Sequence, residues 1–430
     1  MPTPSLLIVP ARFKSGKLYS QIPTSGSGDF TVTRATAATR VNASGLIESV
    51  ASGIPRLDYF ASGGTVGCPA LLVEPSGTNF SRWVNQMTAQ DTPAASGGMT
   101  ITTGSTDFLA PDGTSGSITK YVGGAASGSS QNAYYSGGQV TASASGVHTF
   151  SLFVKRGATN PLNFCAISFA LFTGASGTAT SYFNLASGTA ITAGASVQDY
   201  GNGWYRLSTA PYTLAAADLS GQVIFNMAAT SGSTSFAASG ALNLTAYTWG
   251  AQFEAGSIAT SYIPTTTAAV TRNADVVSVS GAVSGSIGQT EGTIYAEFSV
   301  DFNNRNADIL SLNAGNSNNG FFMSLRDTSV VQLIVRTLGN NELIFQRVGA
   351  FSIGVNKLAM AYKNGDFAIC LNGTAVQTNT NNITMPSVSI NKIGLGDSAL
   401  YVLDRQLRIR SVALYTTRLS NAELAALTTP

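Results

Sequence analysis

Two acidic residues, Glu291 and Glu297, are the best candidates in this sequence for a pair of catalytic carboxylates. They lie in the run EGTIYAEF, and their even separation would place both on one face of a β-strand. Six strand residues span about 20 Å, whereas the two carboxyl groups of a glycosidase lie about 5 to 9.5 Å apart. We therefore predict no catalytic residue and no enzymatic activity, while a pair assembled from distant strands stays open.

The single histidine, His148, limits the other kinds of catalytic site. A Ser-His-Asp or Cys-His site would have to be built around this one ring, and zinc sites with several histidines are excluded. Its surroundings, GVHTFSLFVKR, have the pattern of an ordinary strand. We expect a strand histidine with a satisfied hydrogen bond. The glycine-containing run GNGWYRLS lacks the lysine and the following helix of a phosphate-binding loop.

An oxygen-rich stretch, DFNNRNAD, contains Asp301, Asn303 and Asp308. Hard cations prefer such oxygen ligands, so Ca²⁺ is the one cofactor that the sequence suggests. The spacing matches no fixed calcium loop, and turns are rich in Asn and Asp for conformational reasons alone. Both interpretations, a Ca²⁺ site and a simple turn, stay open.

Aromatic residues near glycines are the candidates for contact with a sugar. Tyr134 and Tyr135 lie in QNAYYSGG, where the glycines predict a loop. Such rings can pack against the apolar face of a sugar, or against the protein itself, including a second subunit. Trp204, Tyr205 and Trp249 lie within strand patterns, and we expect them in the core.

Charged residues are scarce. Only 10% of the 430 residues are Asp, Glu, Lys or Arg, against about 25% in an ordinary domain. A formal net charge of +2 provides no basic field for nucleic acid or an anionic membrane. The first residues, MPTPSLLIVPARF, do not have the pattern of a secretory signal, and we expect no membrane insertion. The three cysteines, Cys68, Cys165 and Cys370, are too far apart for a CxxC pair.

Short strand-like runs separated by Gly- and Ser-rich turns predict an all-β fold with two tandem antiparallel β-sandwiches of the jelly-roll type. We divide the chain into a β-rich region at 1–75, a first sandwich at 76–268 and a second at 269–430. Region 1–75 has too few large apolar residues for a core of its own. The ending LSNAELAALT predicts a short C-terminal helix that begins with a capping box.

The run WGAQFEAGSIATSYIPT changes character halfway. Trp249, Ala251 and Phe253 alternate as in a half-buried strand, and we expect them to pack in the first sandwich as its last strand. The following apolar residues are too irregular for a strand. We predict that SIATSYIPT is a tether that docks on its own sandwich or on a neighbouring subunit.

The C-terminal region resembles the concanavalin A-like, or laminin-G-like, jelly roll. The similar passages are the double hairpin KNGDFAICLNG and the ending IRSVALYTTRLSNAELAAL. Domains of this kind often bind calcium at a rim, which is what the resemblance implies for Asp301, Asn303 and Asp308.

The middle region resembles the head spike fibre domain of phage virion proteins. The similar passages are APDGTSGSITKYV, HTFSLFVKRG, VQDYGNGWYRLS and YTWGAQFEAGSIATSYIPTTTAAVTRNAD, with CPALLVEPSGTNFSRW before them. The resemblance implies a structural protein on the outside of a tailed phage, on head or tail, assembled as a homotrimer in the host cytoplasm. Region 1–75 would then anchor the protein to capsid or tail proteins of the virion.

Two functional interpretations remain. In the first, the protein is a non-enzymatic fibre or spike of the virion surface whose jelly rolls touch host-surface polysaccharide. In the second, it is a virion-associated polysaccharide-degrading enzyme with a site assembled from distant strands or subunits. Low charge, abundant Ser, Thr and Gly, and the missing carboxylate pair favour the first.

Overall fold

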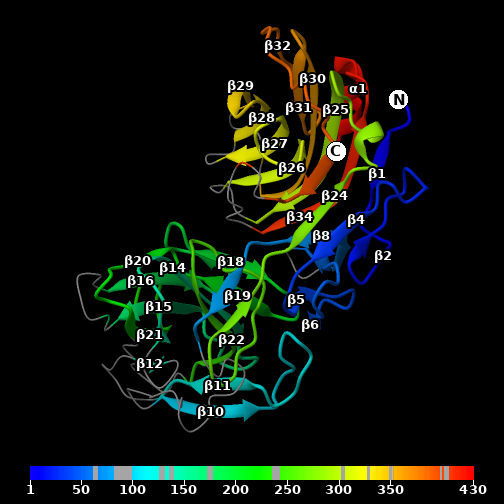
Figure 1. Ribbon diagram of the computed structural model, residues 1–430. Helices are drawn as coiled ribbons and strands as arrows, with labels where there is room; N and C mark the ends of the chain where they lie inside the picture. The colour runs from blue at the N-terminus through cyan, green and yellow to red at the C-terminus, as the bar shows by residue number, and fades with distance from the viewer. Residues whose placement is uncertain are drawn as a thin grey trace.

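The computed structural model describes residues 1–61, 66–81, 99–124, 131–134, 140–170, 172, 178–234, 243–301, 306–326, 330–347, 351, 353–397, 400 and 406–430 (Figure 1). The described residues form antiparallel sheets that pack as two β-sandwiches, together with one α-helix. The predicted all-β class is confirmed.

The first sheet of the C-terminal sandwich has eight strands. Its order is β32 (Gln377–Asn379), β31 (Phe367–Leu371), β30 (Gly354–Lys363), β25 (Glu291–Val300), β34 (Leu407–Tyr415), β8 (Val66–Val73) and β7 (Leu57–Phe60), with β1 (Leu6–Ile8) also on β34.

The second sheet of this sandwich has nine strands. Its order is β2 (Phe13–Lys14), β3 (Lys17–Leu18), β4 (Phe30–Thr33), β24 (Val276–Ser280), β33 (Lys392–Leu395), β26 (Ala307–Asn313), β27 (Gly320–Arg326), β28 (Val330–Thr337) and β29 (Asn340–Arg347). A 3₁₀ turn, η1 (Ser284–Ser286), follows β24.

The middle sandwich pairs a seven-stranded sheet with a six-stranded sheet. The larger sheet has the order β10 (Thr100–Ser105), β11 (Ile118–Val122), β22 (Thr245–Ala255), β14 (Gly146–Arg156), β19 (Trp204–Ser208) and β18 (Ser196–Asp199), with β20 (Tyr212–Leu214) also on β14. The smaller sheet has the order β12 (Gln131–Tyr134), β21 (Ser220–Ala228), β15 (Phe164–Ala170), β16 (Ala179–Asn184) and β17 (Thr189–Ala190), with β13 (Val140–Thr141) on β21.

Local signals in the sequence explain the turns and the helix. The turn Asn372–Gly373 has positive φ at both residues, as a tight hairpin turn requires. Ser420 and Glu423 form the predicted capping box of α1 (Asn421–Thr428). Among the described residues, no helix has the length and apolar character needed to cross a membrane.

Residues 1–75 contribute to both sandwiches. Strands β1, β7 and β8 extend the first C-terminal sheet, and β2 to β4 extend the second (Figure 1). The hairpin β5 (Ala38–Val41) and β6 (Ile47–Val50) instead places Val41 and Ile47 in the core of the middle sandwich. A short pair, β9 (Gly77–Asn79) with β23 (Val270–Arg272), forms a separate two-stranded sheet. The region has few large apolar residues because it completes the cores of other parts of the chain.

A substitution in β1 tests this arrangement. Leu6 is fully buried in the core of the C-terminal sandwich, opposite Leu414. We expect Leu6→Ala to lower the free energy of unfolding by about 2 to 5 kcal/mol, because it leaves a cavity in this core. Urea unfolding followed by circular dichroism measures the change. Val9→Ala is the control, since Val9 is 40% exposed and its loss should cost less than about 0.5 kcal/mol. Equal stability of the Leu6→Ala protein and the wild type would contradict the placement of β1.

Candidate functional site

The tether SIATSYIPT, predicted to dock on its own sandwich or a neighbouring subunit, lies on its own sandwich. Ile258, Tyr262 and Ile263 are buried, and the Tyr262 ring packs on Trp249 with 4.5 Å between ring centroids. Gly250 makes room for this contact, because it adopts a φ of +64° and a Cβ there would lie 3.0 Å from the Phe153 ring. Tyr262 therefore belongs to the core of the middle sandwich, and Ile258 and Ile263 are buried beside it in the chain.

A buried ion network lies next to the tether. We define it by its five residues, which are Arg34, Arg56, Glu74, Arg272 and Asp275. Arg56 is fully buried and donates to Glu74 at 2.6 Å, and it also donates to Asp275. Arg34 donates to Asp275 at 2.9 Å, and Arg272 lies 3.7 Å from Glu74. Each of the two carboxylates thus contacts more than one guanidinium group.

Ser261 connects the tether to this network. Its amide and hydroxyl donate to the two carboxylate oxygens of Glu74 at 2.7 and 2.6 Å, and its hydroxyl accepts from Arg56 at 2.9 Å. Burial alone would raise the pKa of Glu74, but Arg272, Arg56 and Ser261 hold it well below its ordinary value. Glu74 is therefore a charged carboxylate in the interior. Its partners Arg56, Arg272 and Ser261 come from three different segments of the chain.

A second ion set joins the two sandwiches directly. Arg408 of β34 donates to Asp58 of β7 and to Asp301, both at 2.6 Å. Asp301 also accepts from Gln198 of β18, in the middle sandwich, at 3.0 Å. Burial opposes the charge of Arg408, but Asp301 and Asp58 hold its pKa above the ordinary value.

Two of the three residues predicted to bind Ca²⁺, Asp301 and Asp308, are held by other groups. Asp301 pairs with Arg408, and Asp308 is fully buried and accepts from the Ser324 hydroxyl at 2.6 Å and the Leu400 amide at 2.7 Å. Asn303 lies outside the described residues. Within the described ranges no group of three His, Cys, Asp or Glu side chains could hold a metal ion. The calcium site stays a prediction.

The aromatic residues singled out in the sequence divide into two groups. Trp204 and Trp249 are buried in the core of the middle sandwich, as expected, and Tyr205 packs against that core while partly buried. Tyr134 is the last residue of β12 and pairs with Ile224 of β21, so the loop predicted for Tyr134 is wrong. Its side chain and all of Tyr135 lie outside what the structure describes, so their contact with a sugar stays a prediction.

His148 lies in β14, as its sequence context indicates. Its Nδ1 lies 2.9 Å from the Gly146 carbonyl oxygen, and its ring stacks on Phe253 at 5.2 Å between centroids. The side chain is 1% exposed, and its Nε2 has no hydrogen-bond partner among the described residues. Burial lowers the pKa of this imidazole, so the native state holds it neutral.

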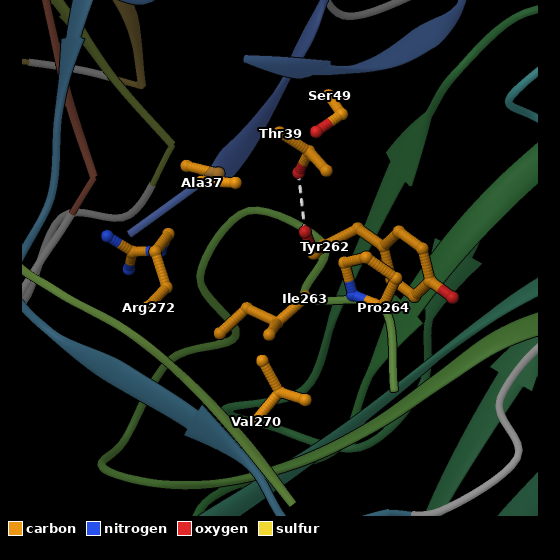
Figure 2. Close-up of a pocket in the computed structure, with 9 residues that line it drawn as sticks. Ala37, Thr39, Ser49, Tyr262, Ile263, Pro264, Val270 and Arg272 are labelled. Atoms are coloured by element: carbon orange, nitrogen blue, oxygen red, sulfur yellow. Dashed lines mark hydrogen bonds between the residues drawn. The ribbon is translucent and has the colours of Figure 1, made fainter. Parts of the chain in front are cut away.

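A small cavity of about 90 Å³ lies between the β5–β6 hairpin and the tether (Figure 2). Its walls include Thr39, Tyr262, Ile263 and Arg272, and Figure 2 shows the hydrogen bond from the Thr39 hydroxyl to the Tyr262 carbonyl oxygen. This cavity is mainly apolar and is too small for a sugar ring. We interpret it as a packing gap beside the ion network.

A larger cavity of about 270 Å³ opens at the tip of the same hairpin. We call it the hairpin cavity. It lies between the hairpin tip at 45–46, the loop 108–111, Lys155 of β14 and the β18–β19 turn at 200–204. The Ile47 amide donates to the Pro111 carbonyl oxygen at 2.9 Å and fixes the hairpin against the loop. The cavity therefore combines region 1–75 with the middle sandwich.

Three aromatic residues contribute to the lining of the hairpin cavity. Phe108, Tyr200 and Trp204 all line it. The indole nitrogen of Trp204 donates to the Leu109 carbonyl oxygen at 3.0 Å, which ties the loop to the turn. No pattern in the sequence predicts this cavity, because its four segments are far apart in the chain and none carries a binding motif.

Comparisons with known proteins find only distant structural similarity. No family model and no curated protein matches the chain. Similar solved structures include the NanB sialidase from Streptococcus pneumoniae, at 20% identity and a TM-score of 0.29 over 36% of this chain and 27% of that one. The Ruminococcus gnavus IT-sialidase CBM40 has 18% identity and a TM-score of 0.30 over 35% and 88%. The binding domain of botulinum neurotoxin serotype D/C has 14% identity and a TM-score of 0.30 over 36% and 40%. Likeness at this level says nothing about a ligand.

Removal of Arg56 should destabilise the buried ion network and weaken its hold on the tether. We expect Arg56→Met to lower the free energy of unfolding by about 3 to 5 kcal/mol, because Glu74 and Asp275 lose a buried partner. The segment 254–271 should also become more sensitive to limited proteolysis. The control is Arg40→Met, since the pair of Arg40 with Glu48 is partly exposed and its loss should cost less than about 1 kcal/mol. Similar effects of the two substitutions would argue against a central role for Arg56.

The buried His148 should make stability depend on pH. The native state holds the ring neutral, whereas the unfolded chain takes up a proton below about pH 6.5. The stability from this residue is therefore complete above about pH 6.5 and decreases as the pH falls, by at most about 1.4 kcal/mol per pH unit. His148→Phe keeps a ring on Phe253 and should lose this dependence. Urea unfolding of both proteins between about pH 5 and 8 measures the difference, and parallel profiles would contradict the assignment.

Proposed function

We propose that this chain is a non-enzymatic structural protein of a tailed-phage virion, and that its β-sandwiches bind glycans on the host surface. The observation that carries the proposal is the buried joint between the two sandwiches. Arg56 and Glu74 of region 1–75 bind Ser261 of the tether, and Arg56 also binds Asp275 at the start of the C-terminal sandwich. Such a joint holds two modules in a fixed orientation, which is what a projecting spike or fibre needs.

The sequence resemblances support the virion part of the proposal. The middle sandwich carries the passages similar to a head spike fibre domain, and the C-terminal sandwich carries those similar to a concanavalin A-like jelly roll. Fold alone does not determine function, so the glycan part needs a site. The aromatic-walled hairpin cavity supports it, because sugar-binding pockets commonly combine aromatic rings with a few polar groups.

The location and partners of the protein belong to the same proposal. We place it on the virion surface, on head or tail, after assembly in the host cytoplasm as a homotrimer. Region 1–75 would attach it to capsid or tail proteins. Because strands β1 to β8 lie in folded sheets and a hairpin, this attachment would use a folded surface of the region.

Incubation with polysaccharide tests the proposed function. The full chain is mixed with surface polysaccharide from candidate host bacteria, and both the retention of the protein and the length of the polymer are followed. We expect retention with unchanged polymer length. A shortened polymer would favour the polysaccharide-degrading alternative, and the absence of retention on every polymer would reject glycan binding.

A further inference from the structure

Lys155 is the charged side chain of the hairpin cavity. It lies in β14 and is partly buried, with its Nζ 4.4 Å from the centroid of the Phe108 ring. The same Nζ donates to the carbonyl oxygen of Asn202. A lysine ammonium group has three N–H donors, so this bond leaves two for another partner.

The charge of Lys155 has no acidic partner among the described residues. The neighbouring carboxylates are bound elsewhere: Asp107 accepts from Lys120 and from the Tyr247 hydroxyl, both at 2.7 Å, and Asp199 accepts from the Gly201 amide at 2.8 Å. Burial lowers the pKa of Lys155, which reflects the cost of a cation in this wall. An anion placed in the cavity would offset that cost.

The size and walls of the hairpin cavity indicate the kind of anion. Its volume of about 270 Å³ is close to the lower end of the roughly 300 to 1,000 Å³ that small-molecule pockets span. That volume suits one sugar ring better than an oligosaccharide. Phe108, Tyr200 and Trp204 are among the residues that line it, so part of the wall is apolar and suits the C–H face of a sugar, whereas a bare inorganic anion would leave that part unused.

We propose that the hairpin cavity binds a single carboxylate-bearing sugar residue of the glycan, with the Lys155 Nζ in contact with the sugar carboxylate. This inference rests on the proposed glycan binding and names the site and the chemical class of sugar. A charge-assisted hydrogen bond inside a partly dry cavity is stronger than a neutral one, so Lys155 would distinguish acidic sugars from neutral ones.

Acidic and neutral sugars that differ only at one carbon test the proposal. D-galacturonate is compared with D-galactose, and D-glucuronate with D-glucose, in ligand-detected NMR titrations of the full chain; inorganic phosphate is titrated separately. We expect at least one acid to bind about tenfold or more tightly than its neutral counterpart, since only the acid forms the charge-assisted bond. We also expect this preference to weaken as salt is added.

Three variants assign the preference to Lys155. Lys155→Met should remove it, and Lys155→Arg should keep most of it. Lys363→Met is the charge-matched control, because Lys363 is 55% exposed, lies 3.3 Å from Glu291 in the C-terminal sandwich and should leave the preference unchanged. A thermal unfolding curve of each variant establishes that it is folded.

Several outcomes would overturn the assignment. They are an equal affinity for acids and neutral sugars, an unchanged preference in Lys155→Met, and phosphate binding as tight as that of the acids. If polysaccharide still retains the protein in those cases, the proposed glycan binding stands and only the cavity assignment fails. If no polysaccharide retains it, the proposed function itself fails.

Discussion

The charge of Arg56 is the constraint on which the arrangement of this molecule depends. A guanidinium group with no access to water is tolerated only when carboxylates and hydroxyls surround it. Here those groups come from Glu74, Asp275 and Ser261, which belong to three different parts of the chain. If one of these parts moved away, the remaining parts would hold a buried charge without its partner. The position of the tether, and with it the relation of the two sandwiches, follows from this requirement.

A few buried charged residues are enough to fix the orientation of the segments that they join. Only 10% of the chain is charged, and several of these residues are in the interior. Arg34, Arg56, Arg272 and Arg408 are all buried beside carboxylates. Such ion pairs add little net stability compared with apolar packing, but they penalise any other arrangement of the same segments. Their contribution here is to orientation, while the two large apolar cores supply most of the stability.

The structural features that depend on neighbouring residues could be predicted from the sequence. The Ser420 capping box and the packing of Trp249 and Phe253 in the middle core follow from short-range patterns and are confirmed. The strand is not half-buried as expected, because Gln252 and Glu254 on its other face are buried as well. Pairing between distant strands could not be predicted from the sequence. The Ser5 amide donates to the Leu414 carbonyl oxygen, and no pattern near either residue indicates this contact. The same holds for the sites. Asp301 has the sequence context of a cation-binding loop, yet a guanidinium from β34 occupies it, and the segments around Lys155 become neighbours only through folding.

The pairing of β1 with β34 has a consequence for the synthesis of the protein. Leu6 and Ile8 leave the ribosome long before their partners Leu414 and Val412 exist (Figure 1). The strands of the middle sandwich, from β10 to β22, are made consecutively, so this module can fold while translation continues. Strand β1 cannot pair until β34 has been made, and closing so long a loop is slow. A polypeptide that ends prematurely would therefore keep an unfinished sandwich with exposed apolar edges, a state that chaperones and proteases recognise.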